Sequence, residues 1–202
     1  TMACVAEAIG LALPDSGSAP AVDETRDRLC AEAGRQVMRL LESNIRPRDI
    51  LTPRAFENAV AVVAATGGST NAALHLPALA NEAGVKFGFD EIERVSKRTP
   101  IIADLKPFGR YTAFEVFQAG GIPAILKVLL DAGLLHGDCL TVTGRTQAEN
   151  LAAVKVRTDQ DVILPVERAL DRSGGLHILR GSLAPEGCVI KTAGVKRLSH
   201  RG

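Results

Sequence analysis

The chain has 202 residues and a formal net charge of +1, and aromatic residues make up only 3% of it. A chain of this length buries roughly 70% of the surface that its unfolded form exposes. We therefore expect an aliphatic core in one domain, or in one domain and part of another. The charge gives no electrostatic basis for binding nucleic acid or an anionic membrane. Because the sequence contains neither an apolar run of roughly 18 residues nor a signal-peptide pattern, we expect a cytoplasmic protein without a membrane span.

The four cysteines, Cys4, Cys30, Cys139 and Cys188, are far apart in the sequence and form no CxxC pair. Cysteines of a cytosolic protein are usually reduced and at least partly buried. Metal-binding cysteines usually come in closely spaced pairs. We therefore expect free thiols and no metal or cluster site built from these residues alone.

Helical patterns fill the first half of the chain. Apolar stripes and helix caps predict helices over five stretches: residues 1–13, 23–43, 52–66, 69–84 and 90–97. Asp23 and Asp90 are suited to be N-caps, and Thr52 followed by Pro53 is a typical helix start. Pro77 predicts a kink inside the fourth helix.

Short β-rich runs alternate with capped helices in the second half. Ile101–Ala103 and Leu140–Val142 are apolar or β-branched and predict strands. The capping boxes TAFE at Thr112 and TQAE at Thr146 predict helix starts, and a double glycine before Pro123 separates two helices. This alternation predicts an α/β fold with a parallel sheet flanked by helices.

The pattern changes near Ser173. Leu176–Leu179 and Val189–Lys191 predict two strands joined by Gly- and Pro-containing turns. A hairpin of two strands is marginally stable by itself in water, so it must pack on other parts of the protein. We interpret residues 1–172 as a partial α/β domain and residues 173–202 as the incomplete beginning of a β domain.

A glycine-rich turn, Thr66-Gly-Gly-Ser-Thr-Asn71, leads into the fourth predicted helix. Backbone N–H groups and the helix dipole at such a turn favour an anion such as a carboxylate or a phosphate. Ser69, Thr70 and Asn71 are therefore candidate substrate-binding residues. The alternative is a plain helix–helix turn in which Ser69 or Thr70 is the cap, with no ligand.

The loop Asp104–Tyr111 follows a predicted strand. In open α/β sheets, ligands bind outside the C-terminal ends of the strands, so Lys106 and Arg110 are candidates to face an anionic substrate. The alternative is a solvated loop with ordinary ion pairs.

His136 lies two residues before Asp138, a pairing that suggests acid–base chemistry or a metal ligand. Local hydrogen bonding in a turn is the commoner reason for this spacing. We find no Ser/His/Asp set and no paired carboxylates at a shared site.

Five stretches together resemble one enzyme family, and they occur in that family's order: TMACVAEAIGLALP at Thr1, AATGGSTNAALHLPALA at Ala64, IADLKPFGRY at Ile102, QAGGIPAILKVLLDAGLLHGDCLTVTGRTQAENLA at Gln118 and RGSLAPEGCVIKTAGV at Arg180. The family is that of the dihydroxy-acid dehydratases and sugar-acid (phosphogluconate and aldonate) dehydratases. The resemblance spans essentially the whole chain. ADLKPFGRY and GLLHGDCLTVTG look more like the dihydroxy-acid enzyme of branched-chain amino-acid biosynthesis.

The resemblance implies a hydro-lyase that converts a 2,3-dihydroxy acid to a 2-keto acid. It implies an iron–sulfur cluster that acts as a Lewis acid on the departing 3-hydroxyl. It also implies a Mg²⁺ ion, held by carboxylates and a carbamylated lysine, and a serine that removes the C2 proton. The whole enzyme is expected to be a homodimer or a homotetramer.

Few of the family's functional residues match positions of this chain. The last cluster cysteine falls just before Thr1, and the other cluster cysteines and the Mg²⁺-binding aspartate and lysine fall further upstream. The Mg²⁺-binding glutamate and the serine base fall beyond Gly202. The resemblance therefore implies a central fragment, inactive by itself, with no catalytic residue and no metal ligand of its own. It comprises the latter part of an N-terminal dehydratase domain and the start of a C-terminal β-barrel-like domain.

Two alternatives remain open. One is a fragment of a sugar-acid dehydratase from the same family. The other, from a different class, is a small anion-binding or structural module that uses the glycine-rich turn.

Overall fold

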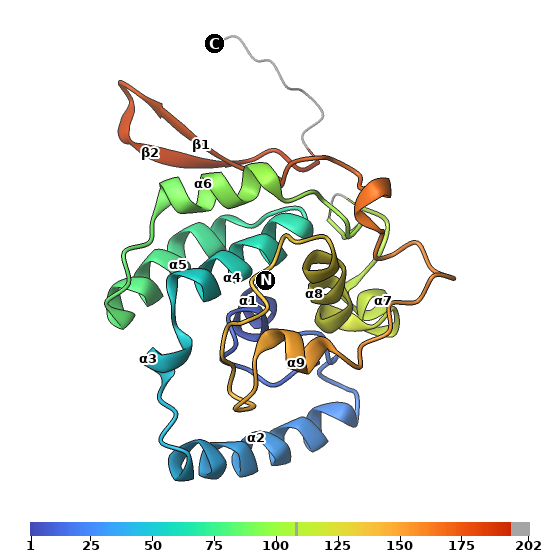
Figure 1. Ribbon diagram of the computed structural model, residues 1–202. Coiled ribbons are helices and arrows are strands. Elements are labelled where there is room, and N and C mark those ends of the chain that lie inside the picture. The colour runs from blue at the N-terminus through green and yellow to red at the C-terminus, as the bar shows by residue number, and fades with distance from the viewer. Residues whose placement is uncertain (108, 195–202) are drawn as a thin grey trace.

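The fold was analysed in a computed structural model, which describes residues 1–107 and 109–194. It is an α/β structure in which helices surround a central helix and one antiparallel hairpin lies over them (Figure 1). The elements are α1 (Met2–Ala8), α2 (Thr25–Glu42), α3 (Pro47–Ile50), α4 (Pro53–Ala65), α5 (Thr70–Ala83), α6 (Phe89–Arg98), α7 (Ala113–Gln118), α8 (Gly121–Asp131), α9 (Gln147–Leu151), a 3-10 turn (Val166–Arg168), β1 (Leu176–Gly181) and β2 (Ala184–Lys191). In this part of the chain, none of the helices has the length and apolarity needed to cross a bilayer.

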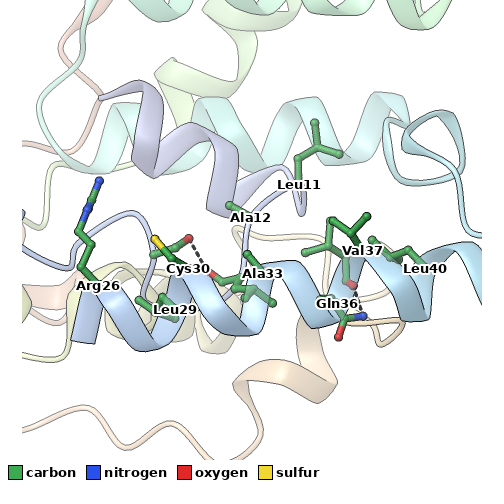
Figure 2. A pocket seen from close by; sticks show the side chains of 12 residues that line it. Leu11, Ala12, Arg26, Leu29, Cys30, Ala33, Gln36, Val37 and Leu40 are labelled. Carbon is green, nitrogen blue, oxygen red and sulfur yellow. Dashed lines mark hydrogen bonds between the residues drawn. The ribbon is translucent and has the colours of Figure 1, made fainter. Parts of the chain in front are cut away.

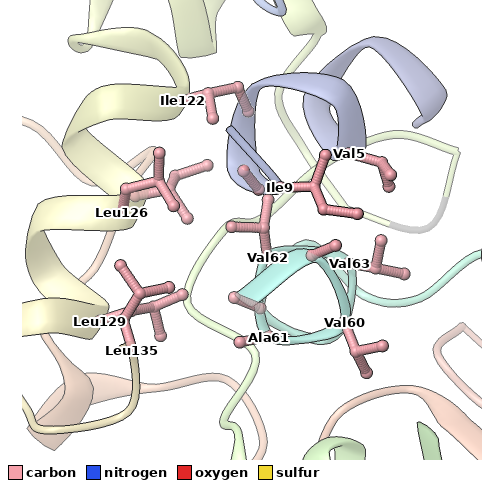
Figure 3. Packing of buried hydrophobic residues seen from close by; sticks show 14 of the residues in the cluster. Val5, Ile9, Val60, Ala61, Val62, Val63, Ile122, Leu126, Leu129 and Leu135 are labelled. Carbon is pink, nitrogen blue, oxygen red and sulfur yellow. The ribbon is translucent and has the colours of Figure 1, made fainter. Parts of the chain in front are cut away.

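Helix α4 is the centre of the core. It begins as predicted, with Pro53 in the first turn and the Thr52 hydroxyl accepting the N–H of Ala55 at 3.2 Å. Every residue from Ala59 to Ala65 is buried, and a helix that is apolar on all faces belongs inside a protein. Aliphatic side chains of α1, α4 and α8 meet there, among them Val5, Val62 and Leu126 (Figure 3).

Helix caps predicted from local sequence are mostly present. The hydroxyls of Thr112 and Thr146 accept the N–H groups of Glu115 and Glu149, and each glutamate binds back to its threonine. The expected caps at Asp23 and Asp90 are wrong. Glu24 is the N-cap residue of α2, and the Asp23 carboxylate accepts the N–H of Thr25 at 2.8 Å from just outside the helix. Helix α6 begins one residue earlier, after Gly88, whose N–H donates to the carboxylate of Glu91 at 2.8 Å.

Other helix bounds differ for physical reasons. Helix α1 ends at Ala8 instead of residue 13 because Gly10 takes a φ of +92° and turns the chain, and the Gly10 carbonyl accepts the N–H of Val142 at 2.8 Å. Helix α8 begins at Gly121, so Pro123 lies in its first turn, where a missing N–H costs nothing. Helix α5 continues past Pro77 to Ala83.

The predicted strands at 101–103 and 140–142 form only isolated antiparallel bridges, and the described residues contain no parallel sheet. The N–H groups of Ile102 and Ala103 both donate to the carbonyl of Ala65, at 2.9 and 3.0 Å. A ladder cannot propagate along a segment whose donors converge on one helix end. The α/β class is confirmed, and its observed sheet is the two-stranded hairpin.

The hairpin of β1 and β2 forms where the sequence predicts it, with Leu176 opposite Lys191. It lies over α6 (Figure 1), and its base packs on the turn between α4 and α5. Glycines are required at this contact. A Cβ on Gly175 would lie 2.5 Å from the carbonyl oxygen of Gly67, and one on Gly68 would lie 2.9 Å from the Cγ of Leu176.

Substitution of Gly68 by alanine tests this close approach. Gly68 has a φ of +81°, so Gly68→Ala adds backbone strain and also a contact with Leu176. Gly84→Ala is the matched control, because Gly84 has a φ of +74° but no atom within 4 Å of the added Cβ. In urea unfolding we expect the free energy of unfolding to fall by about 3 kcal/mol for Gly68→Ala and by about 1 kcal/mol for Gly84→Ala. Equal losses would show that the hairpin base does not restrict this turn.

Candidate functional site

Two of the hollows of ligand size among the described residues differ in chemistry. The first is an apolar groove of about 310 Å³ between α2 and the segment 11–16 (Figure 2). Its walls are mainly aliphatic, with Leu29, Val37 and Leu40 from α2, and the Gln36 side-chain amide donates to the carbonyl of Val142 at 2.7 Å. Such a surface suits apolar groups and offers little to a polar hydroxy acid.

The second hollow is a cleft of about 250 Å³ that several distant segments build together. We call it the polar cleft. It is lined by the start of α1, the turn at 17–18, the start of α5, the loop at 105–107 and the end of β2. Its polar and charged lining residues are Thr1, Cys4, Ser18, Thr66, Ser69, Lys106 and Lys191. Two of the five predicted substrate-binding residues, Ser69 and Lys106, therefore meet at one site.

The glycine-rich turn places Ser69 at the cleft. Gly67 and Gly68 have φ angles of +87° and +81°, which end α4 and reverse the chain. Ser69 is the extended N-cap residue of α5, and no cap hydrogen bond of its hydroxyl is found in the described structure. The first N–H groups of a helix lack intrahelical acceptors and carry the positive end of its dipole. This end of α5 can therefore bind an anion, with Thr70 and Asn71 exposed in its first turn.

The loop carrying Lys106 is held by a pair of charged residues. The Asp104 carboxylate, only 11% exposed, accepts from the Arg110 side chain at 2.5 Å and from its backbone N–H at 3.3 Å. The guanidinium also lies 5.0 Å from the centre of the Tyr111 ring. The backbone N–H of Lys106 donates to the Tyr111 carbonyl at 2.8 Å. The two described ends of the loop are thus joined next to Lys106.

Arg110 contributes to the structure of this loop. A second carboxylate, that of Asp161, lies 3.4 Å from its guanidinium and accepts the Tyr111 hydroxyl at 2.5 Å. The hydrogen bond to Asp104 raises the pKa of Arg110, and the hydrogen bond to Asp161 raises the pKa of Tyr111. Arg110 is not among the residues that line the polar cleft. Its place matches the ordinary ion pairing that was the alternative for this loop.

A buried acid, Glu7, escaped the sequence analysis. Only 3% of it is exposed, and its carboxylate accepts the backbone N–H groups of Asp15 and Gly17 at 2.9 and 2.8 Å. Burial raises the pKa of this carboxyl from 4.5 to about 7. The one signal in the sequence is a glutamate among apolar residues of a helix, followed by a Gly- and Ser-containing turn.

The cysteine that lines the polar cleft, Cys4, is not activated. Cys4 Sγ lies 3.9 Å from the carbonyl oxygen of Gly17, and burial raises the pKa of the thiol. Cys30 and Cys188 are exposed and Cys139 is buried; all four thiols are free. A thiol with a raised pKa is a weak nucleophile and a weak metal ligand at neutral pH.

His136 and Asp138 do not interact with one another as an acid–base pair; each binds a residue of α4. His136 Nε2 lies 2.8 Å from the Glu57 carboxylate, and Asp138 forms an ion pair with Arg54. The side chain of Asn58 both donates to and accepts from the backbone of His136. These contacts fix the turn before Leu140 and leave it without a catalytic arrangement.

The described residues do not fit a metal centre. Within residues 1–107 and 109–194, no group of three or more His, Cys, Asp or Glu side chains is arranged to hold an ion. An iron–sulfur cluster needs several cysteine thiolates close together, and a Mg²⁺ site needs several oxygen ligands, carboxylates among them. This part of the chain supplies neither set.

Comparison with known proteins places the chain in a family. Residues 1–150 match the family described as dihydroxy-acid/6-phosphogluconate dehydratase, N-terminal, and residues 161–202 match the C-terminal part of the same family. The chain therefore belongs to the dihydroxy-acid/6-phosphogluconate dehydratase family.

Several relatives within the family are named dihydroxy-acid dehydratase. Over all 202 residues it is 57% identical to dihydroxy-acid dehydratase 2 of Bradyrhizobium diazoefficiens, covering 35% of that protein. It is also 57% identical to dihydroxy-acid dehydratase 2 of Mesorhizobium japonicum, covering 34% of it. Dihydroxy-acid dehydratase of Acidothermus cellulolyticus is 54% identical, with 36% covered. The chain spans about a third of the length of these curated relatives.

Removal of the Asp104 carboxylate tests the ion pair that holds the loop. Asp104→Ala removes one hydrogen bond from the Arg110 guanidinium and one from the Arg110 backbone N–H at a mostly buried position. We therefore expect the free energy of unfolding in urea to fall by about 2 kcal/mol. Asp159→Ala is the matched control, because the Asp159–Arg157 pair is 70% and 55% exposed and exposed pairs stabilise little. A loss for Asp104→Ala no larger than that for Asp159→Ala would contradict this role.

Proposed function

We propose that this chain is the central part of a dihydroxy-acid dehydratase, a hydro-lyase that converts a 2,3-dihydroxy acid to a 2-keto acid in branched-chain amino-acid biosynthesis. The observation that carries this proposal is identity of more than half of the residues, over the whole chain, with proteins of that name. A sugar-acid dehydratase is the second candidate, because the family's description also includes 6-phosphogluconate dehydratase.

The polar cleft is the proposed substrate-binding part of the chain. A 2,3-dihydroxy acid presents a carboxylate and two hydroxyl groups. The N-terminal end of α5, with Ser69, Thr70 and Asn71, and the Lys106 ammonium are suited to the carboxylate. The hydroxyls of Ser18 and Thr66 line the same cleft. We propose that Arg110 acts indirectly, by holding the loop that carries Lys106.

The groups that perform the chemistry are proposed to lie in the rest of the protein. An iron–sulfur cluster would supply a Lewis acid for the departing hydroxyl, and Mg²⁺ would bind the substrate carboxylate and 2-hydroxyl. The ligand sets needed for both are missing from the described residues, so we assign neither group to this chain. By itself the chain is expected to be inactive.

The organisation of the whole protein follows from the same proposal. Residues 1–172 would form the latter part of the N-terminal domain, whose parallel sheet would include strands from the rest of the protein. Residues 173–202 would begin the C-terminal β domain. A homodimer or homotetramer and a cytoplasmic location stay predictions, as does the absence of nucleic-acid and membrane partners.

The test is substrate profiling of the full-length protein purified under conditions that preserve a cluster. We expect kcat/KM for a branched-chain 2,3-dihydroxy acid to exceed that for 6-phosphogluconate by at least about a hundredfold, because the two differ in size and charge. The opposite preference would establish the sugar-acid alternative. Dehydration by the 202-residue chain alone would contradict the assignment of the chemistry to other parts of the protein.

A substitution of Lys106 tests the role of the cleft. In the full-length protein, Lys106→Met removes the charge and keeps the length of the side chain, so we expect KM to rise about tenfold with kcat changed less than about threefold. Lys155→Met, at an exposed position outside the cleft, is the control and should leave both values unchanged. Equal KM values for the two variants would remove Lys106 from the substrate site.

A further inference from the structure

Glu7 is a buried acid for which the proposed chemistry has no use. It lies on α1 and does not line the polar cleft. Each of its two oxygens accepts one backbone N–H from the turn that follows α1: Oε1 from Asp15 and Oε2 from Gly17. A buried carboxylate that accepts two backbone donors fixes the position of the backbone that donates.

The turn needs this support because its backbone is strained. Asp15 has a φ of +71°, a conformation that residues other than glycine rarely adopt. Gly17 fits only without a side chain, since a Cβ would lie 2.8 Å from the Glu7 carboxylate and 2.9 Å from the carbonyl oxygen of Ala3. The carboxylate, the strained residue and the glycine thus form one tightly packed unit.

Ser18, the next residue of the turn, connects the turn to α8. The Ser18 hydroxyl accepts the backbone N–H of Ile122, in the first turn of α8, at 3.1 Å. A Cβ on Gly121 would lie 2.4 Å from the same hydroxyl. Gly17, Ser18 and Ile122 all line the polar cleft, together with Ser69 and Lys106. A continuous path of contacts therefore joins Glu7 to one wall of the cleft.

We propose that Glu7 is a positioning residue for the polar cleft. Its carboxylate fixes the turn at residues 15–18, the turn fixes the start of α8 through Ser18, and the cleft wall of Gly17, Ser18 and Ile122 is in place before a ligand binds. This inference rests on the proposed function only where turnover is measured, because the position of the wall can be measured without substrate.

The position of Glu7 also predicts how pH acts on the turn. The charged or titratable groups near Glu7 are Asp15, which raises its pKa, and Cys4 on its own helix. The groups nearby from α9 and the segment before it are neutral: Thr141, Gln147 and Asn150. Opening of the turn would expose Glu7 to water and return its pKa from about 7 toward 4.5. The two backbone N–H donors favour the ionised form, but the loss of hydration on burial outweighs them and raises the pKa. Ionisation therefore favours opening, and the turn should open more readily as the pH rises from about 4.5 to 7.

The test is backbone hydrogen exchange of the full-length protein without substrate, read by mass spectrometry in the segments 14–18 and 121–124. In Glu7→Ala we expect exchange in both segments to rise about tenfold or more, because two buried N–H groups lose their acceptor. In Ser18→Ala we expect the rise only in 121–124. Glu82→Ala, at an exposed position on α5, is the control and should change neither segment.

Two further measurements separate positioning from general stability. In Glu7→Gln, which does not ionise, exchange corrected for its intrinsic rate should lose the increase between pH 4.5 and 7 that the parent protein shows. In turnover assays, Glu7→Ala should raise KM about tenfold and change kcat less than about threefold.

The proposal is wrong if segment 121–124 keeps its parent exchange rate while 14–18 loosens in Glu7→Ala. It is also wrong if Glu7→Gln keeps the pH dependence of the parent protein. A full-length protein that dehydrates no dihydroxy acid would overturn the proposed function alone, since the exchange measurements would still decide the role of Glu7.

Discussion

The C-terminal end of α4 is the point where the segments that build the polar cleft converge. Helix α4 is packed on every side, so its last turn lies inside the protein, where its carbonyl groups need partners. The Ala65 carbonyl accepts the N–H groups of both Ile102 and Ala103. Gly67 and Gly68 turn the chain toward α5, and the hairpin base at Gly174 and Gly175 packs against the same turn. The C-terminal end of α4 therefore brings together the loop that carries Lys106, the start of α5 and the end of β2.

This arrangement explains why small residues are required around α4. A Cβ on Gly174 would lie 2.5 Å from the Cβ of Ala64, so the backbones meet at a distance that no larger side chain allows. Alanines on α4 let its neighbours approach closely, and the bulkier side chains of α1 and α8 fill the remaining space (Figure 3). The core is dense around the end of α4, and Ser69 and Lys106, the side chains of the proposed substrate site, are carried by turns at its edge.

Sequence reasoning succeeded where a structure is determined by neighbours along the chain. Thr112, Thr146 and Thr52 cap their helices because each hydroxyl meets an N–H three residues later, a pattern visible in the sequence. The hairpin was predictable for the same reason. The predicted parallel sheet is not seen in the described residues, because Ile102 and Ala103 have the composition of a strand but donate to a helix end far away in sequence. Glu7 was missed because its partners are 8 and 10 residues away, in a turn whose shape the sequence does not reveal.

For the candidate site residues as well, the sequence predicted local features but not which distant segments lie together. Ser69 and Lys106 were proposed separately, from a helix start and from a loop after a strand, and only the fold shows that both line one cleft. Lys191 lies in the region that matches the C-terminal part of the family, whereas Ser69 and Lys106 lie in the region that matches the N-terminal part. A ligand in this cleft would therefore contact both regions. The hairpin base that packs on Gly67 and Gly68 then has two effects, because it stabilises the turn that presents Ser69 and it brings Lys191 to the same cleft.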